Sequence, residues 1–121
     1  MESASSKSVV VWVSDLIFET KIRSTAQSLG VALSTVRNMA SLTAELDRAR
    51  ASLVIVDLNA SGADPIVVVA AAKAHAARPR VIAFVSHVDA DLALRAQAAG
   101  ADEVLPRSRF TVELPRILGP T

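Results

Sequence analysis

Four apolar runs in this chain each end in polar residues. They are VVVWV before Ser14-Asp15, LVIV before Asp57, VIAFV before Ser86-His87, and EVL before Pro106-Arg107. Runs rich in Val and Ile that alternate with helical patterns are typical of parallel strands buried on both faces. In an open parallel sheet, the functional site lies outside the carboxyl ends of the strands. We therefore expect two carboxylates, a hydroxyl and a guanidinium to share one crevice.

The same pattern predicts alternating strands and helices along the whole chain. We expect strands at 8–13, 31–36, 53–56, 80–85 and 103–105, and helices at 16–29, 41–51, 64–77, 89–99 and within 109–118. Ser41 or Thr43 is the expected N-cap of the second helix. Five such units with short connections predict a flavodoxin-like, doubly wound α/β fold, with parallel strands in the order 2-1-3-4-5 and helices on both faces. Residues 1–7 are expected to be a disordered tail, and 8–121 a single domain.

Composition narrows the functional classes. The chain has 121 residues, with 13 Lys and Arg against 12 Asp and Glu, and a formal charge of +1. Aromatic residues make up only 3%, and there is no basic run, so we expect no nucleic-acid binding. No apolar run reaches the roughly 18 residues of a membrane span, and the polar start lacks a signal-peptide core. With no Cys for disulfides or thiol chemistry, these features predict a soluble cytoplasmic domain.

The stretch VDLNASGAD around Asp57 carries a more specific signal. It resembles the phosphoacceptor loop of response-regulator receiver domains, which has the form D-x-N-x-P-G-x-D. The matching positions are Asp57, Asn59, Gly62 and Asp64. Ser61 stands at the Pro of this pattern, and Pro65 stands where the family usually has a final Gly.

Three further positions match this family in register. Asp15 lies where receivers carry an acidic pair, although Ser14 departs from that pair. Ser86 falls at the Ser/Thr position that ends strand four. The stretch AGADEVLPR resembles the receiver segment A-G-A-x-x-Y-L-x-K-P, with Arg107 at the Lys and Ser108 at the Pro. The resemblance spans the chain from the first strand to the last helix.

The resemblance implies a chemistry for these residues. The carboxylate of Asp57 would accept a phosphoryl group, and Mg²⁺ would be bound by Asp15, Asp57 and the backbone carbonyl of Asn59. The hydroxyl of Ser86 and the cation at Arg107 would hold the phosphoryl oxygens. Such a domain signals through a histidine kinase, a phosphotransfer protein or another protein partner, within a phosphorelay-type pathway, and is not an enzyme.

The departures from the family pattern point to a degenerate site. Ser14 removes one negative charge, so we expect Mg²⁺ to bind weakly. A planar guanidinium prefers a fixed fork to following a phosphate, so we expect Arg107 to pair directly with Asp57 without a metal. His87, where receivers usually have a small residue, would crowd the entrance. We therefore predict a stand-alone pseudo-receiver that acts through protein contacts. The alternative is a fully phosphorylatable, Mg²⁺-dependent receiver.

Two other interpretations concern histidine and cofactors. His87 is interpreted as a loop residue bonded to the backbone or to Asp89, because a second metal ligand at suitable spacing is missing. A flavodoxin-like cofactor module is a second alternative. It would need glycines or hydroxyls to cradle a phosphate after strand one, but that loop has no Gly, and the G-x-G-x-x-G fingerprint does not occur. Trp12, on a central strand, is expected in the core.

The last helix predicts an interaction surface. Between Arg109 and Leu118 there is room for little more than two turns, and Pro115 removes a backbone donor. A short helix would leave part of strands four and five uncovered. Five apolar residues would then be available near the gap: Phe110, Val112, Leu114, Ile117 and Leu118. We expect partner binding, or a homodimer, through the face formed by strand four, strand five and the last helix.

Overall fold

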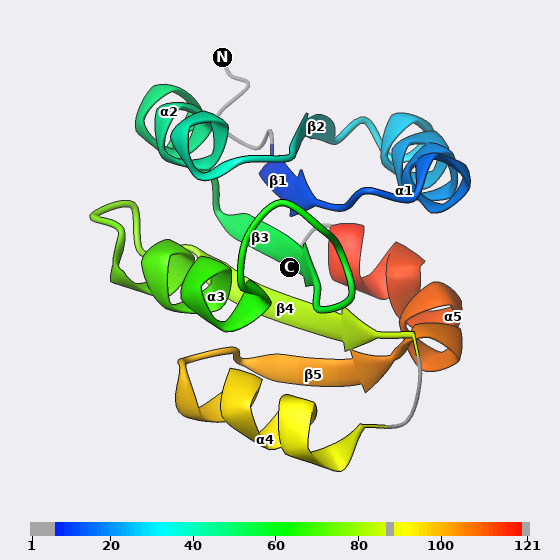
Figure 1. Ribbon diagram of the computed structural model, residues 1–121. Helices are drawn as coiled ribbons and strands as arrows, with labels where there is room; N and C mark the ends of the chain where they lie inside the picture. Colours follow the sequence, from blue (N-terminus) through cyan, green and yellow to red (C-terminus); the bar gives the residue numbers. More distant parts are fainter. Residues whose placement is uncertain (1–6, 87–88, 120–121) are drawn as a thin grey trace.

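The computed structural model describes residues 7–86 and 89–119. Five parallel strands form one sheet in the order β2-β1-β3-β4-β5 (Figure 1). The strands are β1 (Ser8–Trp12), β2 (Ala32–Val36), β3 (Leu53–Asp57), β4 (Arg80–Val85) and β5 (Glu103–Pro106). The predicted flavodoxin-like topology is confirmed, because every neighbouring pair of strands is parallel and every connection runs through a helix.

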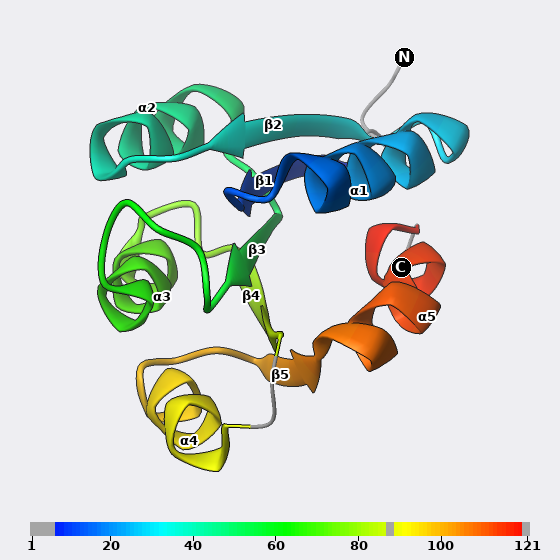
Figure 2. The ribbon, with the colours of Figure 1, turned by 45° about the vertical axis from the view of Figure 1, so that its right-hand side comes forward.

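Helices cover both faces of this sheet. They are α1 (Leu16–Ser28), α2 (Met39–Ala49), α3 (Pro65–Ala74), α4 (Ala90–Ala98) and α5 (Arg107–Leu118). Figure 2 shows α2, α3 and α4 on one side of the strands, with α1 and α5 on the other. Within residues 7–86 and 89–119, none of the helices is both long enough and apolar enough to span a bilayer.

Each strand contributes to two separate cores, because successive side chains point to opposite faces. On β1, Val10 and Trp12 pack toward α2, α3 and α4, whereas Val9 and Val11 pack toward α1 and α5. All four of these side chains are fully buried. Burial on both faces explains why the sequences of the central strands are continuous apolar runs and do not alternate between apolar and polar residues. The burial of Trp12 confirms its expected core position.

Helices α2 and α3 differ from the sequence prediction in where they begin or end. Helix α2 begins at Met39 rather than Ser41, because the side chain of Asn38 is the N-cap and accepts a hydrogen bond from the backbone N–H of Ser41 at 2.8 Å. Helix α3 ends at Ala74 rather than near residue 77. Its chain turns because the ring Nδ1 of His75 accepts the backbone N–H of Ala77 at 3.0 Å.

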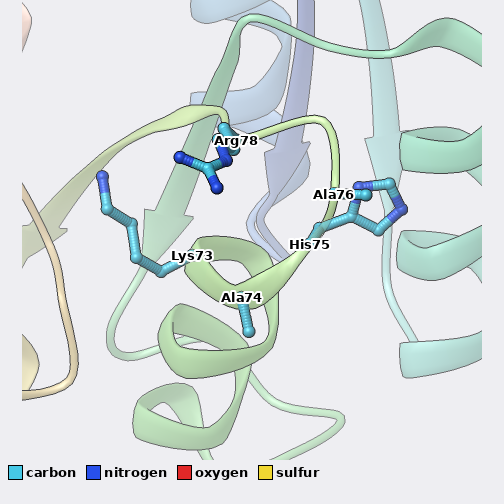
Figure 3. A pocket seen from close by; sticks show the side chains of 5 residues that line it. All are labelled: Lys73, Ala74, His75, Ala76 and Arg78. Atoms are coloured by element: carbon cyan, nitrogen blue, oxygen red, sulfur yellow. The ribbon is translucent and has the colours of Figure 1, made fainter.

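A hollow of about 430 Å³ lies at this end of α3 (Figure 3). Because α3 leads into the start of β4 and Asp57 ends β3, the hollow and Asp57 lie at opposite ends of the parallel strands. It is lined by Lys73, Ala74, His75, Ala76 and Arg78. Two of its basic groups already have acidic partners: Lys73 Nζ lies 2.8 Å from Asp102, and His75 Nε2 lies 2.7 Å from Asp47. Because His75 Nδ1 is an acceptor, its Nε2 carries the proton and donates to Asp47.

The last helix is longer than predicted, and this corrects the expected interaction surface. Helix α5 begins at Arg107 and continues through Pro115 to Leu118. Of the five apolar residues expected to be available, Phe110, Leu114, Ile117 and Leu118 are buried beneath the helix. Only Val112 is exposed, at 77%. The helix tolerates Pro115 because the ring faces solvent and one lost backbone bond is outweighed by the buried side chains.

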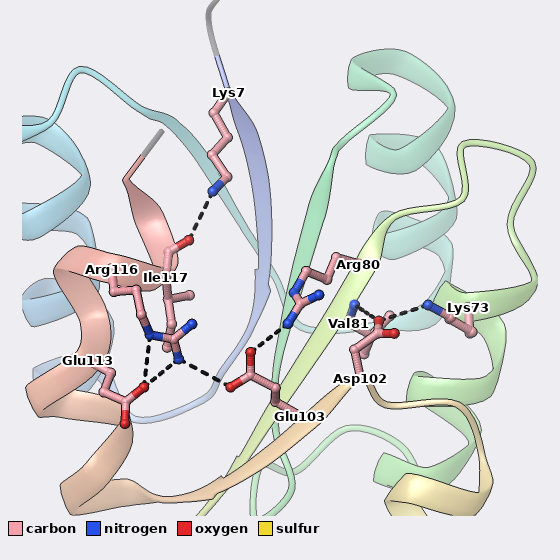
Figure 4. A network of polar contacts seen from close by, with 9 residues as sticks. All are labelled: Lys7, Lys73, Arg80, Val81, Asp102, Glu103, Glu113, Arg116 and Ile117. Atoms are coloured by element: carbon pink, nitrogen blue, oxygen red, sulfur yellow. Dashed lines mark hydrogen bonds and ion pairs between the residues drawn. The ribbon is translucent and has the colours of Figure 1, made fainter. Parts of the chain in front are cut away.

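Ion pairs and a lysine fix the amino-terminal side of β5 and the end of α5 (Figure 4). Glu103 on β5 receives Arg80 at 2.6 Å and Arg116 at 3.2 Å. Lys7 Nζ donates to the carbonyls of Ile117 and Gly119 at 3.0 and 2.9 Å, where α5 has carbonyls without helical partners. Lys7 therefore belongs to the folded domain, in contrast to the predicted tail of residues 1–7. The rest of that tail, residues 1–6, lies outside the described residues.

Candidate functional site

The carboxyl ends of the strands meet at one edge of the sheet, as the parallel topology requires. Asp57 ends β3 and pairs in register with Phe84 of β4, while Val85 pairs with Pro106 of β5. Ser86 follows β4 directly, and Arg107 follows Pro106 as the first residue of α5. The expected site residues therefore come from neighbouring chain segments at one edge.

Asp57 is the last residue of β3 and lies buried at this end of the sheet. It is only 4% exposed, and it is the one buried charged side chain among the described residues. The backbone N–H of Asn59 donates to its Oδ1 at 2.9 Å, and the side-chain oxygen of Asn59 accepts the backbone N–H of Ser86 at 2.7 Å. Asn59 thus joins the ends of β3 and β4. Burial raises the pKa of the Asp57 carboxyl above its usual value, and the nearby Asp15 adds to this effect.

Asp15 follows β1 at the same end of the sheet, is exposed to solvent, and has two sets of hydrogen-bond partners. Its Oδ1 caps helix α1 by accepting the backbone N–H groups of Ile17 and Phe18 at 2.9 and 3.1 Å. Its Oδ2 accepts a hydrogen bond from Arg107 Nη2 at 3.0 Å. The hydrogen bond from Phe18 and the ion pair with Arg107 lower the pKa of the Asp15 carboxyl. The two carboxylates of the crevice thus have pKa values shifted in opposite directions.

Arg107 contacts Asp15 rather than Asp57, so the expected direct Arg107–Asp57 pair is wrong. The guanidinium carbon lies 4.1 Å from the centre of the Phe18 ring, an arrangement that favours a cation over the aromatic face. Phe18 is on α1, and this stacking draws the guanidinium toward the exposed Asp15 and away from the buried Asp57. The charge of Arg107 still acts on Asp57 through space, where it lowers the pKa and partly offsets the effect of burial.

Phe18 is a site residue that the sequence analysis missed. Its ring packs 5.0 Å from Phe84 and 5.9 Å from Phe110, measured between ring centres, and the rings of Phe84 and Phe110 are stacked at 4.5 Å. This cluster joins α1, β4 and α5 beneath Arg107. The only sequence signal was an apolar residue in the first turn after Asp15, which is equally typical of an ordinary core position.

The loop after β3 is fixed by close backbone packing. The hydroxyl of Ser14 accepts the backbone N–H of Ser61 at 3.4 Å. Gly62 has φ +109°, and a Cβ at this position would lie 2.6 Å from the carbonyl oxygen of Arg37 and 3.4 Å from the Trp12 ring. Only glycine fits this arrangement. Ser14, which departs from the acidic pair of receivers, therefore has a structural role in holding the loop.

The residues present do not fit an Mg²⁺ site. Magnesium requires oxygen ligands in octahedral geometry and gives up its waters reluctantly. Both carboxylate oxygens of Asp15 are already engaged, and Ser14 contributes a hydroxyl where a second carboxylate would help. Within residues 7–86 and 89–119, no three His, Cys, Asp or Glu side chains are grouped so as to hold a metal ion. His87 lies outside the described residues.

Comparison with solved structures identifies the fold. The signal receiver domain of a DNA-binding response regulator (merR) from Colwellia psychrerythraea 34H superposes with a TM-score of 0.79 at 21% identity, covering 92% of this chain and 94% of that one. The chemotaxis response regulator CheY4 of Vibrio cholerae gives a TM-score of 0.80 at 16% identity, covering 93% and 96%. The chain therefore has the fold of response-regulator receiver domains.

A third solved structure has the same fold. It is a response regulator from Burkholderia pseudomallei, described with a phosphorylated aspartic acid, a calcium ion and citrate. It superposes with a TM-score of 0.75 at 17% identity, covering 84% of this chain and 59% of that one. No protein-family profile and no curated protein sequence matches the chain.

Proposed function

We propose that residues 7–121 form a single receiver-like signalling domain with a degenerate phosphoacceptor site at Asp57. The observation that carries this proposal is the buried Asp57 at the end of β3, beside an Asp15 that is already occupied by Arg107. A buried carboxylate at the sheet edge is the feature expected of a phosphoacceptor. The occupied Asp15 and the neutral Ser14 reduce its capacity to assemble the metal that phosphoryl transfer needs.

The proposed roles follow from position. Asp57 would be the phosphoacceptor, and the hydroxyl of Ser86 and the guanidinium of Arg107 would contact phosphoryl oxygens. In support, a solved protein of the same fold is described with a phosphorylated aspartic acid. The domain would act in the cytoplasm by binding a protein rather than by turning over a substrate. The alternative of a fully active, Mg²⁺-dependent receiver is favoured only by the preserved Asp57–Asn59–Ser86 arrangement.

A phosphodonor experiment separates these two functions. The chain is incubated with phosphoramidate and Mg²⁺, and acyl phosphate is detected by intact-mass spectrometry. A degenerate receiver gives little or no adduct, whereas the double variant Ser14→Asp/Arg107→Lys gains one. Asp57→Asn should abolish that gain, and Asp64→Asn should leave it intact, because Asn also caps α3. Full labelling of the wild type would establish the active receiver instead.

A histidine kinase or phosphotransfer protein is the proposed partner, with the crevice mouth as the contact. Leu16 and Ile17 in the first turn of α1 are 66% and 86% exposed, beside Asp15. An exposed apolar pair next to a charged crevice fits a protein surface with an apolar centre and a polar rim. The homodimer expected through strand four, strand five and the last helix loses its basis, because α5 covers that face.

Binding to the partner is tested by capture from a lysate of the source organism. Immobilised wild type should retain a histidine kinase or phosphotransfer protein, and Ile17→Asp should lose it. Val112→Asp changes an equally exposed apolar residue on α5 and serves as the matched control. Retention that is lost with Val112→Asp and kept with Ile17→Asp would move the contact to α5 and contradict the proposed surface.

A further inference from the structure

We infer that Arg107 is the resident cation of the crevice and excludes a divalent metal from it. This inference rests on the proposed function for the identity of the site, and it deepens that function by assigning the control of metal access. It follows from three observations. Asp15 accepts hydrogen bonds from both α1 and Arg107, Ser14 carries no charge, and the guanidinium of Arg107 lies over the Phe18 ring.

A metal at Asp15 would have to share the carboxylate with three hydrogen-bond donors, and the remaining acceptor position is on the oxygen that pairs with Arg107. One of its oxygens accepts two backbone N–H groups of α1, and the other accepts Arg107 Nη2 at 3.0 Å. Losing the first contact would expose the uncapped amino terminus of α1, and losing the second would leave a guanidinium beside the incoming cation. Both losses oppose binding, and the second adds direct repulsion between like charges.

The net charge of Asp15, Asp57 and Arg107 attracts a metal ion only weakly. With Asp57 ionised, Asp15 and Asp57 are opposed by Arg107, which leaves one net negative charge. The hydroxyl of Ser14 adds no charge and is used to hold the N–H of Ser61. An ion that dehydrates as reluctantly as Mg²⁺ needs more negative charge than this.

The position of Arg107 is defined by more than its ion pair. The central carbon of its guanidinium lies 4.1 Å from the centre of the Phe18 ring, and its side chain is 31% exposed. Phe18 is itself held by Phe84 and Phe110. A lysine ammonium is a point charge on a flexible stem, whereas the planar guanidinium forms directional contacts, so Arg at this position is expected to be less mobile than Lys.

The test measures metal binding directly, with no phosphodonor and no partner. Mn²⁺ is titrated into ¹⁵N-labelled protein, and paramagnetic broadening of amide signals near Asp57 and Asp15 is followed by NMR. Mg²⁺ is titrated in parallel, with melting temperature as the readout at constant ionic strength. The proteins are the wild type, the single variants Arg107→Ala and Ser14→Asp, and the double variant Ser14→Asp/Arg107→Ala. Arg109→Ala is the matched control, because Arg109 is in the same helical turn but pairs with Glu113.

We expect the wild type and Arg109→Ala to show no saturable binding in the millimolar range. Arg107→Ala should gain saturable binding in the millimolar range, on the order of tenfold tighter than the weakest binding that the wild-type titration could detect, and Ser14→Asp/Arg107→Ala should bind more tightly again. Adding Asp15→Asn to the double variant should remove the gain while keeping α1 capped. Localised, saturable broadening in the wild type, or an affinity unchanged by Arg107→Ala, would overturn the inference.

The outcome is separable from that of the proposed function. If the wild type binds no metal yet a metal-free adduct forms on Asp57, the exclusion stands and the degenerate acceptor fails. If the wild type binds Mn²⁺ at the crevice but phosphoramidate gives no adduct, the exclusion fails and the degenerate acceptor stands.

Discussion

Asp15 and Arg107 are 92 positions apart in the chain, and their side chains meet at 3.0 Å across the mouth of the crevice. This contact links the first turn of α1 to the first turn of α5. Because Asp15 also caps α1, one carboxylate supports a helix end and neutralises a guanidinium at the same time. The contact therefore joins the N-cap of α1 to the start of α5.

The two roles of Asp15 can be separated by substitution. Asp15→Asn keeps a good N-cap and removes only the ion pair, so we expect a small fall in melting temperature. Asp15→Ala removes both contacts and should lower it by several degrees more. Thermal unfolding followed by circular dichroism measures the difference. Equal melting temperatures for the two variants would show that the N-cap hydrogen bonds of Asp15 do not stabilise the folded protein.

Arg107→Ala should destabilise the domain only modestly, by about 1 kcal/mol, because a partly exposed ion pair and a cation–π contact each contribute little. Arg107→Lys should fall between the alanine variant and the wild type. Urea unfolding provides the free energies, with Arg109→Ala as the control. A decrease of several kcal/mol in the free energy of unfolding would show that Arg107 stabilises the fold far more than a partly exposed ion pair does.

The buried Asp57 gives stability a defined pH dependence. Burial raises the pKa of the Asp57 carboxyl in the folded state. At pH values between the pKa of the unfolded chain and this raised pKa, the folded protein therefore holds a proton that the unfolded chain has released. Stability contributed by this residue is therefore lost as the pH rises above the usual carboxyl pKa of about 3.9, and the ionised form is a penalty at neutral pH. We expect Asp57→Asn to have the higher melting temperature at pH 7. That advantage should disappear as the pH falls below about 4. An advantage that persists in acid would point to another cause.

Asp15 has the opposite sign, and the comparison provides a check. Its pKa is lowered, first by the backbone hydrogen bond from Phe18 and then by Arg107. Its contribution is therefore present above the usual carboxyl pKa and lost as the pH falls through the lowered value. The melting temperature of Asp15→Asn should approach that of the wild type in acid from below. Asp57→Asn should approach it from above.

Gly62 and Gly30 form a matched pair of glycines. Both have positive φ, but a Cβ at Gly62 would lie 2.6 Å from the backbone oxygen of Arg37, whereas at Gly30 nothing lies within 4 Å. Gly30→Ala should lose about 1 kcal/mol from backbone strain alone. Gly62→Ala should lose roughly 3 kcal/mol and change the fluorescence of the neighbouring Trp12. Equal losses would mean that the loop after β3 moves freely.

The two faces of α5 should respond differently to charge. Leu114 is 1% exposed and Val112 is 77% exposed. Leu114→Glu should therefore cost roughly 3 kcal/mol or more by burying an unpaired charge, while Val112→Glu should stay within about 0.5 kcal/mol of the wild type. Sedimentation of Val112→Glu against the wild type also tests for self-association. A dimer that is dissociated by Val112→Glu would locate an interface on the exposed face of α5.

Local sequence determined the architecture of this protein. Strands buried on both faces must be apolar throughout, and parallel neighbours need a helical crossover, so the alternating pattern predicts a parallel, doubly wound sheet and the end of the strands where Asp57 lies. Asp57, Ser86, Asp15 and Arg107 could be located for the same reason, because each lies just after a predicted strand, whereas Asn59 was identified by the resemblance of its loop to that of receiver domains. These features depend on neighbours within a few positions.

Only the tertiary structure decided which carboxylate Arg107 contacts and what α5 covers. The first choice depends on the depth of Asp57, the exposure of Asp15 and the ring of Phe18, which are brought together from distant parts of the chain. The second depends on four apolar side chains that outweigh the missing donor of Pro115. A charge has no preferred partner in a linear pattern, because Coulomb attraction and burial depend on three-dimensional distance and on exclusion of water.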